Sequence, residues 1–151
     1  MAKKAVLIGA GQIGRGFIGQ VLCEAGYALT FVDASQALVD DINRYRQYKV
    51  IVMGAGEQEY VIDNISACLP DTEQAVAALC EASLVTTAVG PTALAKTATT
   101  IAAGIVRRVT GQQDQLGLPG AAGGPHRLLA DLQTAGLAGQ PQHVEDGIIG
   151  H

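Results

Sequence analysis

The stretch "VLIGAGQIGRGFIG", residues 6–19, decides the fold because it places five glycines in fourteen positions directly behind an apolar run. Residues 5–8 are continuously apolar, which is typical of a strand buried on both faces of a parallel sheet. Residues 12–25 then repeat apolar side chains at helical spacing, and Gly26 suits the C-terminal cap of that helix. The apolar side of this predicted helix comprises Ile13, Phe17, Val21 and Leu22.

Three of these glycines, Gly9, Gly11 and Gly14, match the pattern G-x-G-x-x-G at the junction of strand and helix. The first glycine permits a sharp turn, and the second lets the pyrophosphate of a dinucleotide approach the backbone. The third lets the helix pack closely on the strand, and the pyrophosphate lies against the free amides at the positive end of the helix. An ordinary tight turn between strand and helix is the alternative interpretation.

A carboxylate, Asp33, ends the second predicted strand, residues 28–34, and lies 19 residues beyond Gly14. An acidic side chain at this position accepts hydrogen bonds from the adenosine ribose hydroxyls and repels a 2′-phosphate. No Arg or Lys follows Asp33 before Arg44, so the sequence favours NAD over NADP as the cofactor. The alternative is that Asp33 is a solvated loop acid without a ligand.

Strands and helices alternate along the rest of the chain to about residue 111. Ser35 can cap a second helix, Asp71 with Gln74 resembles a capping box, and Pro91 suits the first turn of a further helix. This alternation predicts an α/β fold with a Rossmann-like, doubly wound parallel sheet that is incomplete. The later predicted elements are helices at 35–48, 72–82 and 91–109, a hairpin of strands at 49–54 and 58–66, and a buried strand at 83–90.

The end of that last strand supplies a second wall of the predicted crevice, near the nicotinamide half of the cofactor. A plain turn at Gly90 and Pro91 is the alternative. Arg15 follows the third glycine of the fingerprint and either reaches a phosphate of cofactor or substrate or points to solvent. The predicted cofactor-binding residues are Gly9, Ala10, Gly11, Gln12, Ile13, Gly14, Arg15, Gly16, Asp33, Ala88, Val89 and Gly90.

Bulk properties exclude several classes of partner. A net charge of −4 and a pI near 5.2 argue against a nucleic acid or an anionic membrane held by bulk electrostatics. No apolar stretch reaches the roughly 18 residues that a membrane helix needs, and no signal peptide is evident, so we expect a cytoplasmic protein. The three cysteines have no CxxC spacing, which predicts reduced thiols, and no histidine has neighbours at metal-ligand spacing, so no metal site is predicted.

The composition changes near residue 111, which predicts a Rossmann domain over 1–111 and an irregular tail over 112–151. The last forty residues contain eight Gly, three Pro and six Gln, but no Lys, Phe or Tyr. One hypothesis for this change is a frameshift near codon 112 that gives an out-of-frame tail. A deliberately shortened protein, or a naturally short protein with a genuine tail, is the alternative.

The segments "GAGQIGRGFIG", "LTFVDA" and "LVTTAVGP" together resemble the Rossmann domain of the polyol-specific long-chain dehydrogenases, over roughly residues 3–111. Within that family they are most similar to enzymes that interconvert D-mannitol 1-phosphate and fructose 6-phosphate with NAD, ahead of those acting on mannitol or hexuronates. The resemblance implies that the loop at 5–16 holds NAD and that Asp33 selects it. It also implies that substrate binds in a second, mostly helical domain.

The catalytic motif of that family, Lys-x4-Asn-x2-His, does not occur in this sequence, because the fifth and eighth residues after the last lysine, Lys96, are Ile101 and Gly104. No catalytic residue is therefore predicted. A lysine base removes the alcohol proton as hydride leaves, so we expect NAD binding with little turnover of a sugar or polyol phosphate unless a substrate domain is supplied. A non-catalytic NAD-binding module is the alternative, and an incomplete sheet would expose apolar surface that favours oligomers.

Overall fold

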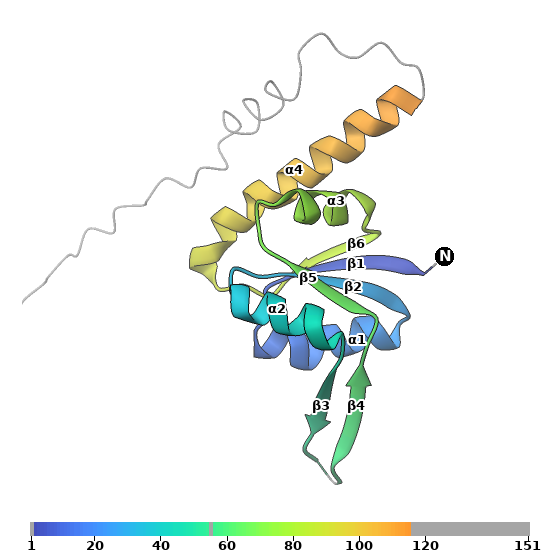
Figure 1. Ribbon diagram of the computed structural model, residues 1–151, viewed down its shortest axis with the longest axis vertical. Coiled ribbons are helices and arrows are strands. Elements are labelled where there is room, and N and C mark those ends of the chain that lie inside the picture. The colour runs from blue at the N-terminus through green and yellow to red at the C-terminus, as the bar shows by residue number, and fades with distance from the viewer. Residues whose placement is uncertain (1, 55, 116–151) are drawn as a thin grey trace, which may run out of the picture. The chain divides into compact units, whose positions relative to one another are not determined.

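The computed structural model describes residues 2–54 and 56–115, and its centre is a four-stranded parallel sheet (Figure 1). Ile8 lies opposite Val32 on one side and Thr87 on the other, so the carboxyl ends of three strands meet at one edge. The α/β fold with a parallel sheet is therefore confirmed. The strands, in spatial order, are β5 (Ile65–Cys68), β2 (Tyr27–Val32), β1 (Lys3–Ile8) and β6 (Leu84–Thr87).

Helices cover both faces of this sheet, as the doubly wound prediction requires (Figure 1). Alternate side chains of β1 point to opposite faces, so Ala5 and Leu7 enter one core while Val6 and Ile8 enter the other. Each face is apolar, which explains why the strand reads as a continuous apolar run. One face carries η1 (Gly14–Ile18), α1 (Gly19–Glu24) and α2 (Gln36–Tyr45), and the other carries α3 (Glu73–Glu81) and α4 (Pro91–Gln115).

The first helix differs from the prediction in its shape and in its buried side. Helical backbone begins at Gln12 and is followed by the π-helical turn η1, in which the amide of Gly19 donates to the carbonyl of Gly14. Ile13, Phe17 and Val21, predicted to face the core, are 69%, 66% and 49% exposed. The buried side instead contains Gly14, Gly19 and Leu22, because small residues let the helix approach the sheet more closely than bulky ones would. Gly26 has a φ of +80° beyond the helix end, as a C-terminal cap requires.

Two predicted helix caps have different outcomes. The Ser35 hydroxyl accepts a hydrogen bond from the Leu38 amide at 3.4 Å, which confirms the predicted cap of α2. The cap of α3 is Thr72, whose hydroxyl accepts from the Ala75 amide at 3.2 Å, and the prediction of Asp71 was wrong by one residue. Asp71 instead adopts a φ of +58° in the preceding turn.

The middle of the chain contains one strand more than predicted. The hairpin is present as β3 (Tyr48–Val52) paired antiparallel with β4 (Gln58–Ile62). The predicted strand 58–66 was wrong, because Asn64 at a φ of +54° interrupts it and the chain then enters β5. β5 pairs in parallel with β2 and so belongs to the central sheet.

The final strand and helix also depart from their predicted bounds. β6 ends at Thr87 rather than Gly90, and Leu84 and Val85 are 37% and 36% exposed instead of buried. The reason is that no strand pairs with the outer side of β6 within residues 2–54 and 56–115. α4 begins at the predicted Pro91 but continues past 109 and 111 to Gln115. The predicted irregular tail beyond 115, with its predicted short helix and all three histidines, lies outside the described residues.

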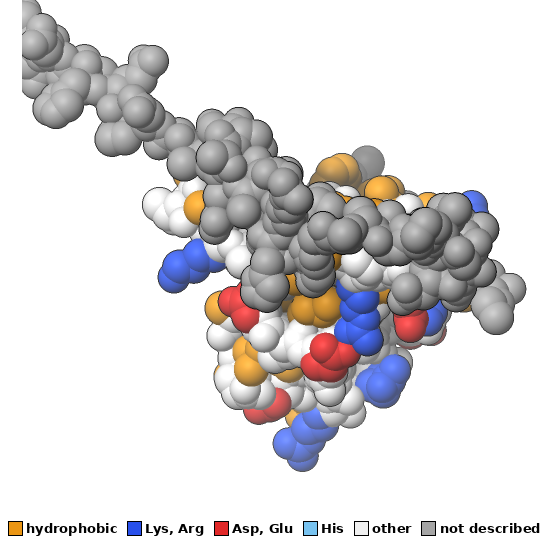
Figure 2. Space-filling model, turned by 90° about the horizontal axis from the view of Figure 1, so that it is seen from above, with side chains coloured by type: hydrophobic (Ala, Val, Ile, Leu, Met, Phe, Trp, Pro, Cys, Tyr) orange, Lys and Arg blue, Asp and Glu red, His pale blue; other side chains and the backbone are white. Residues whose placement is uncertain are grey.

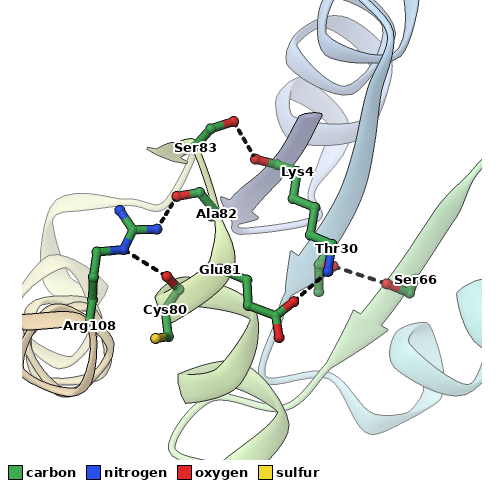
Figure 3. A network of polar contacts seen from close by, with 8 residues as sticks. All are labelled: Lys4, Thr30, Ser66, Cys80, Glu81, Ala82, Ser83 and Arg108. Atoms are coloured by element: carbon green, nitrogen blue, oxygen red, sulfur yellow. Dashed lines mark hydrogen bonds and ion pairs between the residues drawn. The ribbon is translucent and has the colours of Figure 1, made fainter. Parts of the chain in front are cut away.

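Polar contacts join helices α3 and α4 to the sheet, as Figure 3 shows. The Arg108 guanidinium of α4 donates to the carbonyl of Cys80 at 2.7 Å and to that of Ala82, at the C-terminal end of α3. Ser83 then donates its amide and its hydroxyl to the carbonyl of Lys4, at 2.8 and 3.0 Å. These contacts join the end of α3 to both α4 and β1, and so fix the strand that follows.

The described surface carries charges of both signs. On the face shown in Figure 2, Lys and Arg side chains alternate with Asp and Glu side chains and do not gather into one basic region. Within the described part of the chain, none of the helices combines the length and the hydropathy needed to cross a membrane.

The three cysteines, Cys23, Cys68 and Cys80, are free.

Candidate functional site

A cavity of about 390 Å³ lies at the edge of the sheet where β1, β2 and β6 end. Because these strands are parallel, the loops that follow them meet at that edge, which is where ligands bind in open α/β sheets. Six predicted residues line this cavity, which we call the glycine cavity: Gly9, Gly11, Asp33, Ala88, Val89 and Gly90.

The three fingerprint glycines have the three different environments that their predicted roles require. Gly9 has a φ of +97°, and a Cβ there would lie 2.6 Å from the carbonyl oxygen of Ala88. A Cβ on Gly14 would lie 2.1 Å from the carbonyl oxygen of Gly9, so this position must be glycine for helix and strand to touch. A Cβ on Gly11 would meet nothing within 4 Å, because it would project into open space at the cavity.

Asp33 is held firmly at the end of β2 by two backbone amides. Its Oδ2 accepts from the amide of Ala10 at 2.8 Å, and its Oδ1 accepts from the amide of Ser35 at 2.9 Å. The first of these bonds joins the carboxylate directly to the glycine-rich turn. Each carboxylate oxygen can accept more than one hydrogen bond, so the group retains capacity for hydroxyl donors of a ligand.

Several residues of the glycine cavity were missed by sequence reasoning. They come from the turn after β5, from the inner side of α4 and from the residue after Asp33, and those in the turn were missed because β5 itself was not predicted. Asp71 accepts a hydrogen bond from the buried Thr100 hydroxyl at 2.6 Å, which ties the turn to the helix. Spacing of Ala93, Thr97 and Thr100 along α4 was the available signal. The missed residues are Ala34, Pro70, Asp71, Ala93, Lys96, Thr97 and Thr100.

The other predicted site residues are placed differently. Ala10 is fully buried and reaches Asp33 through its amide, while Ile13 projects from the surface. Gln12, Arg15 and Gly16 line a separate cavity of about 340 Å³ between the start of the helix and β3. The structure therefore places six of the twelve predicted residues in the glycine cavity and three in this second cavity, while Ala10, Ile13 and Gly14 line neither. Among the described residues, no group of three or more His, Cys, Asp or Glu side chains is arranged to hold a metal ion.

The groups of the glycine cavity fit a dinucleotide. Gly11 leaves space beside the backbone for a pyrophosphate, and helical backbone begins at Gln12, so the first helical amides point toward that space. The fixed Asp33 carboxylate stands at the end of the neighbouring strand, where a ribose would lie. Together with the sheet order β5-β2-β1-β6, this arrangement defines a nucleotide-binding domain of the Rossmann type.

Comparison with known proteins identifies the family. Residues 3–118 match the mannitol dehydrogenase Rossmann domain, and the chain belongs to this family. The chain is 46% identical over 107 residues to a mannitol-1-phosphate 5-dehydrogenase of Shouchella clausii and 50% identical over 107 residues to that of Brevibacillus brevis. These alignments cover 70% of this chain but only 29% and 28% of the two relatives. The family match extends a few residues beyond the predicted domain end at 111.

Proposed function

We propose that this domain binds NAD in the glycine cavity, with the pyrophosphate beside Gly11 and the adenosine ribose on Asp33. The observation that carries the proposal is the contrast between Gly11 and the other two fingerprint glycines, together with the place of Gly11 in the lining of the glycine cavity, which the equally unobstructed Gly16 does not share. Gly9 and Gly14 are required by contacts inside the protein, whereas a side chain on Gly11 would clash with nothing in the domain itself. A glycine at that position is explained by a ligand that approaches the backbone.

Asp33 is the residue that favours NAD over NADP in this proposal. Its carboxylate accepts from the ribose hydroxyls and repels a 2′-phosphate. Lys96 also lines the glycine cavity, so a cation is available to a phosphate group. The preference for NAD therefore depends on the charge of Asp33, which two amides hold in place.

The reaction we propose for the protein to which this domain belongs is oxidation of D-mannitol 1-phosphate to fructose 6-phosphate. The two relatives at 46% and 50% identity are mannitol-1-phosphate 5-dehydrogenases, which supports this substrate. NAD, when bound, supplies the acceptor for hydride from the alcohol carbon. The contribution of this domain is to bind and orient the cofactor, with the backbone at 88–90 forming the wall on the nicotinamide side.

We expect the 151-residue chain to bind NAD but to turn over little D-mannitol 1-phosphate without a substrate domain. No lysine in the sequence stands in the motif Lys-x4-Asn-x2-His, so the proton acceptor of the family is not supplied by these residues. The free thiols fit a reducing, cytoplasmic setting, which is part of the proposal. NAD reduction at an ordinary enzymatic rate by the purified chain would contradict the expectation of low turnover.

Isothermal titration calorimetry of the full chain with NAD measures the affinity and so tests the proposed binding. Gly11→Ala leaves the fold intact, because its Cβ meets nothing within 4 Å, but we expect it to weaken NAD binding by about tenfold or more, the equivalent of ~1.4 kcal/mol. Gly16→Ala is the matched control, since its Cβ also meets nothing within 4 Å and lies outside the glycine cavity. Equal NAD affinity of the wild type and Gly11→Ala, or no saturable binding, would overturn the proposal.

A further inference from the structure

The two edges of the central sheet differ in how their outer backbone groups are satisfied. At the β5 edge, the side chain of Asn43 in α2 pairs with the backbone of Ala67. Its Nδ2 donates to the Ala67 carbonyl at 2.8 Å, and its Oδ1 accepts from the Ala67 amide at 2.9 Å. This contact occupies the groups that an incoming strand would need. At the opposite edge, no strand within residues 2–54 and 56–115 pairs with the outer side of β6 (Figure 1).

The outward backbone groups of β6 belong to Val85 and Thr87. The amide of Ala88 donates inward to the carbonyl of Ile8 at 2.7 Å. Successive residues of a strand direct their backbone groups to alternate sides, so the amides and carbonyls of Val85 and Thr87 point away from β1. Natural edge strands are normally protected from pairing by a charged residue, a proline or a bulge. Residues 84–87 have no charge and no proline, and they pair with β1 without a bulge.

The helix that follows β6 carries an exposed apolar stripe. The stripe, which we call the α4 stripe, consists of Leu94, Ala98, Ile105 and Val109, which recur at helical spacing. Ile101 lies between them in the sequence and packs against the core on this face of the sheet. The α4 stripe therefore adjoins the core but is not covered by it.

The α4 stripe faces away from β1, as the open edge of β6 does. Arg107 forms an ion pair with Glu73 of α3, and Ile105, two residues earlier, lies about 200° round the helix from it. The stripe is thus on the side of α4 turned away from α3. α3 itself covers β1, because Leu79 and Val6 belong to one core.

The side of α4 that carries the stripe is also free of charge. Residues 91–111 include three charged side chains, and each of them is directed elsewhere. Lys96 lines the glycine cavity, Arg107 pairs with α3, and Arg108 donates to the carbonyls at the end of α3. Two such helices can therefore approach each other without like-charge repulsion at the contact.

We propose that the chain forms a homodimer in which β6 pairs antiparallel with β6 of a second copy. A twofold axis at Thr86, perpendicular to the sheet, places Val85 opposite the partner's Thr87. Each outward amide then faces an outward carbonyl of the other copy. The same axis keeps both α4 helices on one face of the joined sheet, so that the two α4 stripes cover each other.

A second copy fits this surface better than the other occupants. It supplies an identical open edge and an identical uncharged stripe, whereas a charged partner would have its charge buried without a counterion. The sequence beyond α4 contains no apolar run longer than three residues, 128–130, from which to form a buried strand.

Sedimentation equilibrium of the full chain, from micromolar to hundreds of micromolar, tests the dimer. We expect the mass to rise with concentration from 15.5 kDa towards twice that value. Amide hydrogen exchange, followed by NMR over the same concentrations, locates the contact. The amides of Val85 and Thr87 should become protected as the mass rises.

Two variants test the two parts of the interface. Thr87→Pro removes an outward amide but leaves the inward bond of Ala88, as is tolerated on an edge strand. Ile105→Glu places a charge within the α4 stripe. We expect each to raise the dissociation constant of the dimer by about tenfold or more. Val61→Glu is the matched control, because Val61 on β4 is 55% exposed against 57% for Ile105 and lies opposite Lys49.

If Thr87→Pro does not fold, Ile105→Glu and its control still test the interface. A monomer at every concentration would overturn the proposal. Protection of Val85 and Thr87 in such a monomer would show that the chain covers its own edge, and exchange without protection would show that the edge stays open. A dimer weakened no more by Ile105→Glu than by Val61→Glu would place the contact elsewhere and would also overturn it.

Discussion

Two cavities lie beside the first helical turn, and they are formed in different ways. One is the glycine cavity, and the other, the Arg15 cavity, is lined by Gln12, Arg15, Gly16 and residues 48–51. The glycine cavity consists mainly of backbone, and its shape depends on the side chains that Gly9, Gly11 and Gly14 lack. The Arg15 cavity is formed by two segments far apart in the sequence, which contribute the cationic residues Arg15 and Lys49 to its lining. The spacing of nearby residues therefore determines the glycine cavity, whereas the Arg15 cavity forms only when distant parts of the chain come into contact. At the glycine cavity itself, substitution of Gly14 should therefore damage the fold, whereas substitution of Gly11 or Asp33 should affect binding alone.

The largest effect is expected at Gly14. Gly14→Ala places a methyl group 2.1 Å from the carbonyl oxygen of Gly9, and neither backbone can move without separating helix and strand. We expect a loss of about 3 kcal/mol or more in the free energy of unfolding, as measured by urea denaturation of the full chain. Gly16→Ala, in the same π-helical turn, should change stability by less than about 1 kcal/mol. Equal stabilities of the two variants would show that the turn does not pack as described.

A smaller effect, on binding alone, is expected at Asp33. Asp33→Asn keeps an oxygen that can accept from the Ala10 or Ser35 amide but removes the negative charge. We expect NAD affinity to fall by about tenfold and the ratio of NADP to NAD affinity to rise, with Lys96 then free to pair with the 2′-phosphate. Asp41→Asn, on the exposed side of α2, is the control for loss of one negative charge. If Asp33→Asn left the ratio of NADP to NAD affinity unchanged, Asp33 would not be the residue that selects NAD.

The smallest effect is a dependence of stability on alkaline pH at the partly buried Cys23 of α1. Burial, with a smaller contribution from the charge of Asp63, raises the pKa of the Cys23 thiol to about 11. The folded state therefore holds this proton more tightly than the unfolded chain does, so its contribution is complete below about pH 9 and is lost as pH rises to about 11. Tyr48, whose pKa is also raised by burial, acts in the same direction.

Urea denaturation between pH 8 and 11 checks this dependence. We expect Cys23→Ala to flatten the decline in stability, and Cys80→Ala to leave it as in the wild type. A decline of the same slope in all three proteins would assign it to groups other than the Cys23 thiol.

The same contrast explains how much the sequence could predict. The turn from β1 into the helix and the position of Asp33 were predicted because residue spacing alone determines them. β5 was missed because residues 58–66 read as one strand, and the break depends on the left-handed backbone of Asn64. The exposure of Phe17 was missed because periodicity identifies an apolar side but not whether a partner covers it. The Arg15 cavity could not be predicted, since it requires the contact between Tyr48 and the backbone of Arg15.

The most direct test of the central claim is to map NAD on the full, isotope-labelled chain by its effect on backbone amide chemical shifts. NAD binding in the glycine cavity predicts saturable changes at Gly9, Gly11, Asp33 and residues 88–90, with the sheet residues Thr30 and Ser66 unaffected. These two lie on the same sheet but line other hollows of the described surface. Changes centred on Thr30 and Ser66, or no saturable change at Gly11, would contradict the proposal that this domain binds NAD in the glycine cavity.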